Sequence, residues 1–517
     1  MFKKILLLLS FIAFLQFGYA QQCGTYHKED IQLITKRLLA NKARVAKYGY
    51  SKSRETIYVP VIFHLVGKND GKGRAKFGSI LGQMNRLNRD YKDQNIQFFM
   101  AGKGTLQFVN LINSTKLYSD PGSTGGFSAM SLKKKKNLVN VYVCNVADTN
   151  SKIGITLGYY SPSNDWIVMR KDRTNSSSST LSHEMGHFFS LLHPFSGWDA
   201  EIYDKGVHGN PVQEFSPSGN LNENQNRTGE CKNCDKAGDY LCDTPPDYNF
   251  GLSWNGCSTY TAGTMDPCGV VVHPMENNYM AYFSGCAQYE FTPDQKAMIA
   301  TDYADRAAHK KINTTVKPIT HEEINEDVAT KILTPEPNQK LNRYGNIDLT
   351  WEPVSGAIRY MVEIATRSDF SKDYEVFYVE NDNFKHFDEL KPNKSYYWRV
   401  AAYNQMYSNI GTNKKYKFTT GAELVATNDI ASVNFFKVAP NPSPTGTSLN
   451  LSLNTTQSFE SNIQVFDIAG KSIMNTPFKF NIGYNTAVLP TQALNSGLYF
   501  IQIQTKDGTI NEKIVIQ

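Results

Sequence analysis

The chain has 517 residues, of which 40% are hydrophobic, 12% aromatic and 20% charged, so it is long enough for about two to four globular domains. Its formal net charge of +6 is too dilute over this length to indicate binding to nucleic acid. The densest basic run, Lys133–Lys136, is typical of a solvated surface loop.

Residues 1–20 have the pattern of a secretory signal peptide. Lys3 and Lys4 precede the apolar stretch Ile5–Phe17, and Ala20 provides a small residue at the cleavage position. This stretch is too short and wrongly flanked for a transmembrane helix, and no later segment is long and apolar enough to span a bilayer. We therefore expect export through the periplasm, no transmembrane anchor in the mature chain, and an environment in which disulfides persist.

The next two regions are interpreted as a pro-segment and a catalytic domain. Residues 21–54 are polar and basic, with one helical pattern around Ile31–Ala40. Residues 55–310 mix strand and helix patterns, which predicts an α+β domain with a mixed twisted sheet that carries the active-site helix on one face. The predicted elements are strands at Thr56–Val66, Asn95–Met100 and Leu138–Val146, and helices at Phe77–Tyr91, around His183, and at Phe291–Arg306.

The most informative stretch is His183–His193, which has the pattern H-E-x-x-H and a third histidine six residues further on. Residues four apart share one face of a helix, so His183 and His187 can both reach one metal ion. Glu184 is placed to activate a water molecule at that metal, as in a zinc peptidase. The alternative is a coincidental match in a purely structural helix.

The third histidine can join the site only if the helix ends early. Six residues of continuous helix turn the chain by about 600°, which would leave His193 about 120° away from the ligand face. A left-handed conformation at Ser190 would end the helix at a cost of about 1–2 kcal/mol, and Pro194 disfavours helix at His193. We therefore expect the helix to end between His187 and His193, and His193 to be the third zinc ligand. The zinc would keep one open position for water.

Motifs further along the chain resemble those of the pappalysin family of zinc metallopeptidases, in the metzincin clan. Asn277–Tyr282 resembles the methionine turn of that clan. Gly238–Pro246 carries the pattern Gly-Asp-x-x-x-Asp-Thr-Pro-Pro, and Phe291–Pro293 follows in the same order. The resemblance covers about Tyr58–Arg306 and implies an endopeptidase that acts on proteins.

The same resemblance implies roles for single residues. Met280 would lie beneath the zinc, and Tyr282 would stabilise the tetrahedral intermediate, although a packed core tyrosine is the alternative. In relatives the Gly-Asp pattern wraps a calcium ion, and Asp239 and the carbonyl of Thr244 match the ligand positions. A plain turn stabilised by aspartate side chains would have the same sequence. Metzincins commonly have a glycine where this chain has Ser190.

The resemblance also bears on which residue the enzyme would prefer after the scissile bond. Some relatives prefer Arg or Lys after the scissile bond, and an acidic residue shortly before the cysteine that follows the methionine turn accompanies that preference. Here Phe283, Ser284 and Gly285 precede Cys286, and none of them is a carboxylate. We therefore predict a broader or apolar preference at this subsite.

The cysteine count is informative because one of the eight cysteines lies in the pro-segment, so maturation would leave seven. Cys144 lies in an apolar strand and is interpreted as a buried free thiol. The resemblance to the pappalysin family implies the pairs Cys257–Cys286, Cys231 or Cys234 with Cys268, and Cys242 with the one that remains. The sequence alone does not fix this connectivity.

Cys23 and Gly24 in the pro-segment suggest how the precursor is kept inactive. A thiolate is a good zinc ligand, so Cys23 could fill the open coordination position. Pappalysin relatives carry a similar Cys-Gly in the pro-segment, which favours this cysteine switch. The alternative is a disulfide from Cys23 to Cys144 or to another partner. The basic run Lys36–Arg54 offers sites for removal of the segment.

Two further modules follow the catalytic domain. Residues 311–334 are charged and poor in apolar residues, which indicates a linker. Residues 335–420 contain short alternating strands such as Ile347–Trp351. With Trp351 packing the core and Tyr396 at a corner, this region resembles a fibronectin type III β-sandwich.

Residues 421–435 form a second predicted linker, and residues 436–517 a last β-sandwich. Its Ala439–Pro442 start, Asp467–Lys471 turn and Gly497–Tyr499 strand resemble, in this order, the C-terminal sorting domain of the type IX secretion pathway. The resemblance implies a Gram-negative bacterium, with the secretion machinery as a partner and a secreted or cell-surface location. The alternative is a small structural sandwich.

Together these features predict a secreted zinc endopeptidase that is made as a latent precursor. One rival is a surface adhesin or glycan-binding protein with a degenerate peptidase domain, against which the intact Glu184 argues. A second rival is a zinc hydrolase with a non-protein substrate, against which the methionine turn argues.

Overall fold

The computed structural model describes residues 21–25, 28–50, 55–102, 107–149, 155–412, 414–422 and 432–517. The predicted signal peptide, residues 1–20, lies outside this range. The described chain forms two compact units. The first contains the residues up to Thr334 together with Thr350–Lys385 and Tyr397–Tyr416; the second contains Pro335–Leu349, His386–Tyr396 and Lys417–Gln517.

A seven-stranded mixed sheet is the centre of the predicted catalytic region. Its strands are β1 (Gln21–Cys23), β2 (Ile57–Gly67), β3 (Ile96–Met100), β4 (Asn110–Asn113), β5 (Val139–Cys144), β6 (Ile155–Ser161) and β7 (Trp166–Arg170). Their order is β1-β6-β7-β5-β2-β3, with β4 also paired to β2. Strand β2 is parallel to β3, β4 and β5, whereas β6 is antiparallel to β7. The predicted mixed sheet is thus confirmed.

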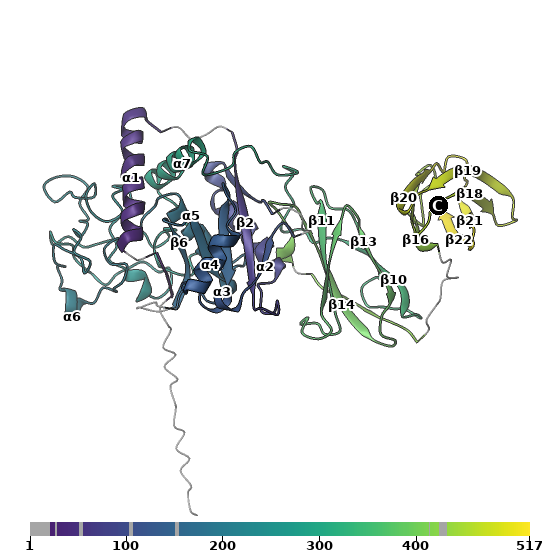
Figure 1. The fold of residues 1–517 in the computed structure, drawn as a ribbon, viewed down its shortest axis with the longest axis horizontal. Helices are drawn as coiled ribbons and strands as arrows, with labels where there is room; N and C mark the ends of the chain where they lie inside the picture. The colour runs from purple at the N-terminus through teal and green to yellow at the C-terminus, as the bar shows by residue number, and fades with distance from the viewer. Residues whose placement is uncertain are drawn as a thin grey trace, which may run out of the picture. The chain divides into compact units, whose positions relative to one another are not determined.

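Helices cover this sheet because each presents an apolar stripe to it. On α2, for example, Ile80, Met84 and Leu87 are buried in the core that also contains Val59 and Val61 of β2. Among the described residues the α-helices are α1 (Lys28–Tyr48), α2 (Phe77–Asp90), α3 (Thr115–Ser119), α4 (Thr124–Lys133), α5 (Thr180–Phe188), α6 (Lys205–His208) and α7 (Pro293–Ala308). Helix α1 lies beside α7 (Figure 1).

The helix starts and short turns also follow from the sequence. Thr292 caps α7 with a capping box in which the Thr292 and Gln295 side chains each bond the other's backbone, and Pro293 opens the helix. Short 3-10 turns complete the helical elements: η1 (Lys92–Gln94), η2 (Lys171–Arg173), η3 (Phe250–Leu252) and η4 (Ile410–Thr412).

Between α5 and α7 the chain has little regular structure and is held by three disulfides. The structure joins Cys231 to Cys268, Cys234 to Cys242, and Cys257 to Cys286. Of the two pairings left open for Cys268, it contains the one with Cys231. Cys23 and Cys144 are buried and free, so the alternative disulfide between them is not present.

The middle β region has two sheets. Its strands are β8 (Ile332–Thr334), β9 (Gln339–Lys340), β10 (Gly345–Trp351), β11 (Arg359–Ala365), β12 (Glu375–Glu380), β13 (Phe384–Glu389), β14 (Ser395–Tyr403) and β15 (Tyr416–Thr419). They are ordered β13-β10-β8 and β12-β11-β14-β15-β9. Trp351 is fully buried, and the Tyr396 hydroxyl accepts a hydrogen bond from the Lys391 backbone N–H at 2.9 Å. The predicted linker 311–334 is partly packed, since Ile312 and Ile324 are buried.

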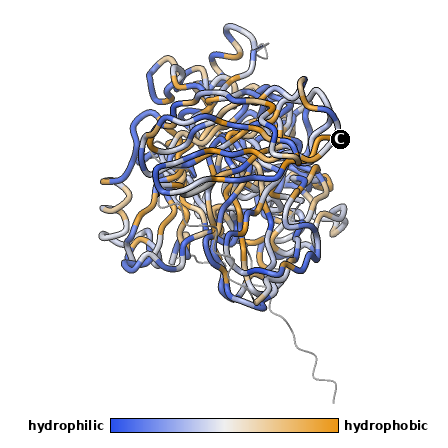
Figure 2. Tube along the Cα trace, turned by 90° about the vertical axis from the view of Figure 1, so that its right-hand side faces the viewer, coloured by the Kyte–Doolittle hydropathy of each residue, from blue (hydrophilic) through white to orange (hydrophobic). Residues whose placement is uncertain are grey.

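The C-terminal β region has its own hydrophobic core. Its strands are β16 (Val433–Ala439), β17 (Leu449–Thr455), β18 (Phe459–Asp467), β19 (Ser472–Phe480), β20 (Gly483–Leu489), β21 (Gly497–Thr505) and β22 (Gly508–Ile516). They form sheets ordered β16-β17-β20 and β19-β18-β21-β22. Buried and exposed residues alternate along β17 and β20, and Figure 2 shows hydrophobic and hydrophilic segments alternating near the C-terminus. In the part of the chain that is described, no helix is long and apolar enough to cross a membrane.

Candidate metal centre

Helix α5 ends where the third histidine requires it to end. Phe188 is its last residue, and Ser190 has a left-handed backbone with φ of 70°. The Leu191 N–H donates to the Gly186 carbonyl and the Ser190 N–H to the His187 carbonyl, both at 2.9 Å. These two bonds define a Schellman motif, which normally has a glycine at the left-handed position. The predicted early end of the helix is confirmed.

This turn brings the three histidines together with one cysteine. One ligand atom each of Cys23, His183, His187 and His193 lies within 4.8 Å of the others, and all four side chains are buried. His193 Nε2 lies 3.1 Å from His183 Nε2 and 3.0 Å from His187 Nε2. Two nitrogens bound to one tetrahedral zinc lie roughly 3.3 Å apart, since each zinc–nitrogen bond is about 2.0–2.1 Å long. The spacing therefore fits one zinc ion.

The hydrogen bonds behind the three rings set which nitrogen faces the site. Each Nδ1 lies against an oxygen that can only accept, so each Nδ1 carries the proton. The acceptors are Tyr279 O for His183 at 2.7 Å, Leu191 O for His187 at 2.8 Å, and Asp199 Oδ1 for His193 at 2.6 Å. Three bare Nε2 lone pairs therefore converge, an arrangement that a cation stabilises.

Burial keeps the rings of His183 and His187 neutral. Burial and the neighbouring His193 lower the pKa of His183 to about 3, and the same causes hold the pKa of His187 well below its usual range. Neutral imidazole is the form that binds metal, so these two candidate ligands need no proton loss near neutral pH.

The predicted methionine turn lies directly against α5. Met280 is fully buried, and a Cβ added to Gly186 would lie 2.4 Å from its sulfur. The turn is fixed by Asn278, whose side-chain oxygen accepts from the Met280 N–H at 2.9 Å and whose amide donates to Gln295 Oε1 at 2.9 Å. Because Tyr279 O in the same turn accepts from His183, the methionine turn also orients a candidate ligand.

Glu184 lies in the same buried space. Its Oε2 accepts a hydrogen bond from the Cys23 thiol at 3.2 Å, and its Oε1 has no hydrogen-bond partner among the described residues. Burial raises the pKa of this carboxyl to about 8. A carboxylate with a raised pKa beside a metal site has the properties of a general base.

The predicted pro-segment reaches this site as an added strand. Strand β1 pairs in parallel with the edge strand β6, with Cys23 opposite Gly158. The Tyr282 hydroxyl accepts from the Cys23 N–H at 3.0 Å and lies 3.2 Å from the Cys23 carbonyl oxygen. Burial raises the pKa of the Cys23 thiol, and the nearby Glu184 raises it further. Cys23 thus contacts the candidate base and the candidate stabiliser, Tyr282, and lies within reach of all three histidines.

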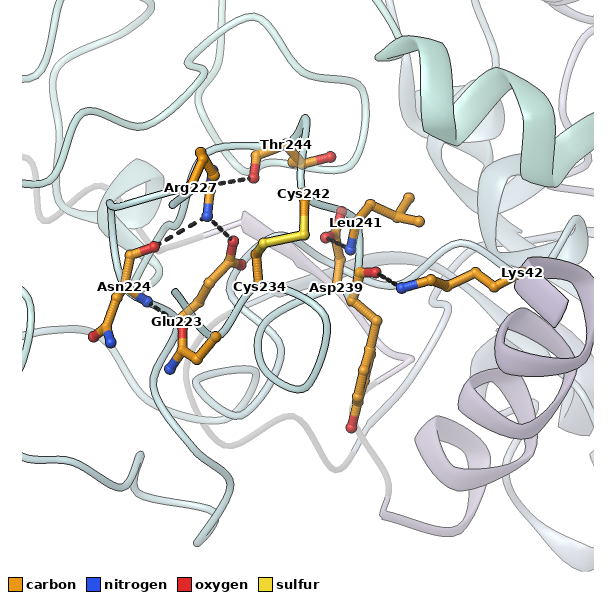
Figure 3. The surroundings of a disulfide bond; sticks show 11 residues. Lys42, Glu223, Asn224, Arg227, Cys234, Asp239, Leu241, Cys242 and Thr244 are labelled. Carbon is orange, nitrogen blue, oxygen red and sulfur yellow. Dashed lines mark hydrogen bonds and ion pairs between the residues drawn. A yellow bond between two sulfur atoms is a disulfide. The ribbon is translucent and has the colours of Figure 1, made fainter. Parts of the chain in front are cut away.

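Two buried carboxylates, Asp239 of the segment predicted to bind calcium and Glu223 from outside it, lie in this region (Figure 3). Arg227 donates to the Thr244 carbonyl and to Glu223 Oε1, each at 2.7 Å, so a guanidinium already faces one predicted ligand. Asp239 Oδ1 accepts from the Leu241 N–H at 2.9 Å. Asp239 Oδ2 and Glu223 Oε2 have no hydrogen-bond partner within the described ranges. These two oxygens are buried and lack hydrogen-bond partners in the described chain, whereas the Thr244 carbonyl is engaged by Arg227.

Asp243 in the same pattern has a different role. It accepts hydrogen bonds from the Thr292 hydroxyl at 3.0 Å and from the Asp294 N–H at 2.7 Å. It therefore stabilises the N-terminus of α7, where unpaired N–H groups and the helix dipole favour a carboxylate.

Two site residues were missed by sequence reasoning. Asp199 lies six residues after His193, and Glu223 lies in a polar loop. Neither position carries a local pattern, because each acts through a contact that forms only when the loops fold. A buried acid close to a metal-binding histidine is a common partner in zinc sites, and that is the one signal that could have pointed to Asp199.

Comparisons with known proteins show similarity to a sorting domain and to extracellular metalloproteases. Residues 437–517 match the family model of the secretion system C-terminal sorting domain. An extracellular metalloprotease of Neurospora crassa is 27% identical over 315 residues, which are 56% of this chain and 90% of the relative. One of Verticillium alfalfae is 27% identical over 295 residues, 54% and 87% of the two chains. The predicted resemblance to metallopeptidases and to the sorting domain is thereby confirmed.

A solved structure of a mutant of promirolysin from Tannerella forsythia is also similar to this chain. It is 17% identical, with a TM-score of 0.37, and the match covers 56% of this chain and 95% of that one.

Proposed function

We propose that this protein is a secreted, zinc-dependent endopeptidase that is made as a latent precursor. The observation that carries the proposal is the convergence of three histidine Nε2 atoms, each fixed through its Nδ1, beside the buried carboxylate of Glu184. The similarity to extracellular metalloproteases supports it independently.

In this proposal His183, His187 and His193 hold the zinc. The ion supplies Lewis-acid chemistry, which polarises the scissile carbonyl and makes water more acidic. Glu184 takes a proton from the attacking water and passes it to the leaving amine. Tyr282 would donate its hydroxyl hydrogen to the developing oxyanion. Its contact with the backbone of Cys23 supports this role, because a bound peptide would bring similar backbone groups.

We propose that contacts of Cys23 keep the precursor inactive. The Cys23 thiol lies among the candidate ligands and bonds the candidate base, so it would block both the open metal position and the proton acceptor. A Cys23→Ala precursor should therefore hydrolyse casein without processing. A variant as inactive as the wild-type precursor would contradict the switch.

A calcium site would be held by Asp239 together with Glu223, rather than by Asp239 with Thr244. The unpaired buried oxygens of the two acids support this change, because calcium prefers carboxylate oxygens.

We also propose that the enzyme accepts a broad range of residues, or prefers apolar ones, at the subsite after the scissile bond. The sorting domain and the extracellular relatives support export through the type IX machinery and peptide or protein substrates.

The decisive test is casein hydrolysis after removal of the pro-segment near Arg54. We expect activity that is lost with a zinc chelator and falls at least about 10³-fold in Glu184→Gln, since the general base is removed. Glu201→Gln, which changes an exposed glutamate near the site, is the matched control. Casein cleavage that survives Glu184→Gln, or no cleavage by the parent protein, would instead favour a surface adhesin or glycan-binding protein with a degenerate peptidase domain.

A further inference from the structure

The pro-segment also contacts the catalytic region far from Cys23, through helix α1. Ile34 and Leu38 are fully buried in the same hydrophobic core as Leu181 and Phe188 of α5 (Figure 1 labels both helices). The helix is therefore packed into the catalytic region, in addition to the contact that strand β1 makes with its edge.

Two polar side chains of α1 reach the last turn of α5. Arg37 donates to the Phe188 carbonyl at 2.8 Å and forms a 2.5 Å ion pair with Asp302 of α7. Asn41, which is 2% exposed, donates through its side-chain amide to the Ser190 hydroxyl oxygen at 3.0 Å and to Asp302 Oδ1 at 3.1 Å. The pro-segment thus bonds both the end of the helix and the turn that follows it.

Ser190 is the residue of this turn that needs support. Its φ of 70° disfavours any residue with a Cβ, and glycine usually takes this position in a Schellman motif. Its side chain is fully buried, and the bond from Asn41 is the one hydrogen bond that its hydroxyl makes within the described chain. If the turn relaxed, His193 would leave the metal-binding face, because it follows Ser190 by only three residues.

We propose that α1 of the pro-segment positions the third zinc ligand, with Asn41 as the positioning residue that holds Ser190 in its left-handed conformation. The inference rests on the zinc site proposed above. Arg306 also donates to the Phe188 carbonyl at 2.8 Å, so that bond outlasts removal of the pro-segment. Asn41 has no such substitute at Ser190. The precursor therefore retains zinc more firmly than the mature enzyme, for a reason separate from the Cys23 thiolate.

A double-mutant cycle in the full-length precursor tests this inference. The variants are Asn41→Ala, Ser190→Gly and both together, with Cys23 intact in all of them. The measurements are the rate of zinc release to a chromogenic chelator and the melting temperature of the metal-free protein. Arg44→Ala is the control, because Arg44 joins α1 to Asp305 by a 2.6 Å ion pair without contact to α5.

In the parent, Asn41→Ala should speed zinc release about threefold to tenfold, the effect of one lost buried hydrogen bond. In the Ser190→Gly background the same change should have little effect, because glycine needs no support there. Arg44→Ala should leave zinc release unchanged. Equal effects of Asn41→Ala in both backgrounds, or an equal effect of Arg44→Ala, would overturn the inference.

Failure of the proposed function would give results different from those that overturn the inference about Asn41. If none of the proteins bound zinc, the zinc site itself would be wrong, and the melting temperatures would decide the inference alone. A loss of melting temperature by Asn41→Ala that is smaller in Ser190→Gly would still support the role of Asn41 at Ser190, without the zinc ligand, and an additive loss would overturn that role as well.

Discussion

At the scale of single residues, the candidate metal centre depends on the groups behind the candidate ligands as much as on those ligands. A carboxylate behind a metal-binding imidazole fixes the ring and raises its basicity, more so than a carbonyl does. Among the described residues, His193 alone of the three histidines has a carboxylate partner, Asp199, whose second oxygen is held by the Gly197 N–H at 2.8 Å. His193 is also the ligand that lies outside α5, so it depends most on such support.

Asp199→Asn should therefore lower zinc affinity about 10- to 100-fold, the range known for second-sphere partners of metal-binding histidines. The amide keeps the shape of the side chain and removes its charge. Competition with a chelator of known affinity measures the effect in the mature enzyme. Asp172→Asn, which alters an exposed aspartate paired with Arg170, is the control, and an unchanged affinity in Asp199→Asn would refute the role.

The candidate ligands could be predicted from sequence because their pattern is local. His183 and His187 share a helix face by their spacing, and the early helix end could be argued from Ser190 and Pro194. Asn41 could not be predicted, since it meets its partner only through a tertiary contact, and Asp199, six residues after His193, was missed because it belongs to no motif. The bond between Asn41 and Ser190, for example, joins residues 149 positions apart.

At the scale of the elements, β2 is the strand on which the sheet is organised. From Val59 onwards it is buried on both faces, and it pairs with three other strands. It carries a fully buried polar residue, His64, which bonds Asn140 Oδ1 through Nε2 at 3.0 Å and the Asn110 amide through Nδ1 at 2.9 Å. This network is satisfied only by a neutral imidazole with its proton on Nε2.

The contribution of His64 to the stability of this region should therefore fall in mild acid. Burial lowers the pKa of His64 from 6.5 to about 4. The stabilisation of the neutral ring is fully present above pH 6.5 and is lost as the pH falls from 6.5 towards 4, by about 3 kcal/mol in all. Denaturant unfolding of the metal-free protein at pH 7.5 and 4.5 measures this loss.

His64→Gln should make that pH dependence shallower, whereas His309→Gln, at an exposed histidine, should leave it unchanged. Equal pH dependence in wild type and His64→Gln would show that another group is responsible.

The elements with strong periodicity were predicted close to their observed bounds, as for Phe77–Tyr91 against α2 and Asn95–Met100 against β3. Strands β6 and β7 were not predicted. Strand β6 contains Gly158 and pairs partly with the pro-segment, so its role at the edge of the sheet depends on residues far away in the sequence. The loops after α5 owe their shape to disulfides, whose pairing no periodic pattern encodes.

At the scale of the whole molecule, the features proposed to serve catalysis and export lie in different parts of the chain. The candidate metal centre lies in the first compact unit, and the matched sorting domain, residues 437–517, lies in the second. The sorting domain has a core of its own, which includes Leu451, Ile463 and Ile501. Such a domain is expected to act as an address and not to take part in catalysis.

Deletion of residues 437–517 should abolish export while leaving the activity of the purified, processed enzyme within about twofold, since catalysis needs only the contacts of the metal centre. Fractionation of cells that express the native or the shortened gene, followed by a casein assay of each fraction, measures both effects. Export of the shortened protein at the native level would contradict this division of roles.

The central claim is a zinc ion held by three histidines and covered by Cys23, and X-ray absorption at the zinc edge of the full-length precursor tests it most directly. We predict three nitrogen neighbours at about 2.0–2.1 Å and one sulfur at about 2.3 Å. The sulfur should vanish in Cys23→Ala while the nitrogens remain. A precursor whose zinc has no sulfur neighbour, or fewer than three imidazole nitrogens, would contradict the account.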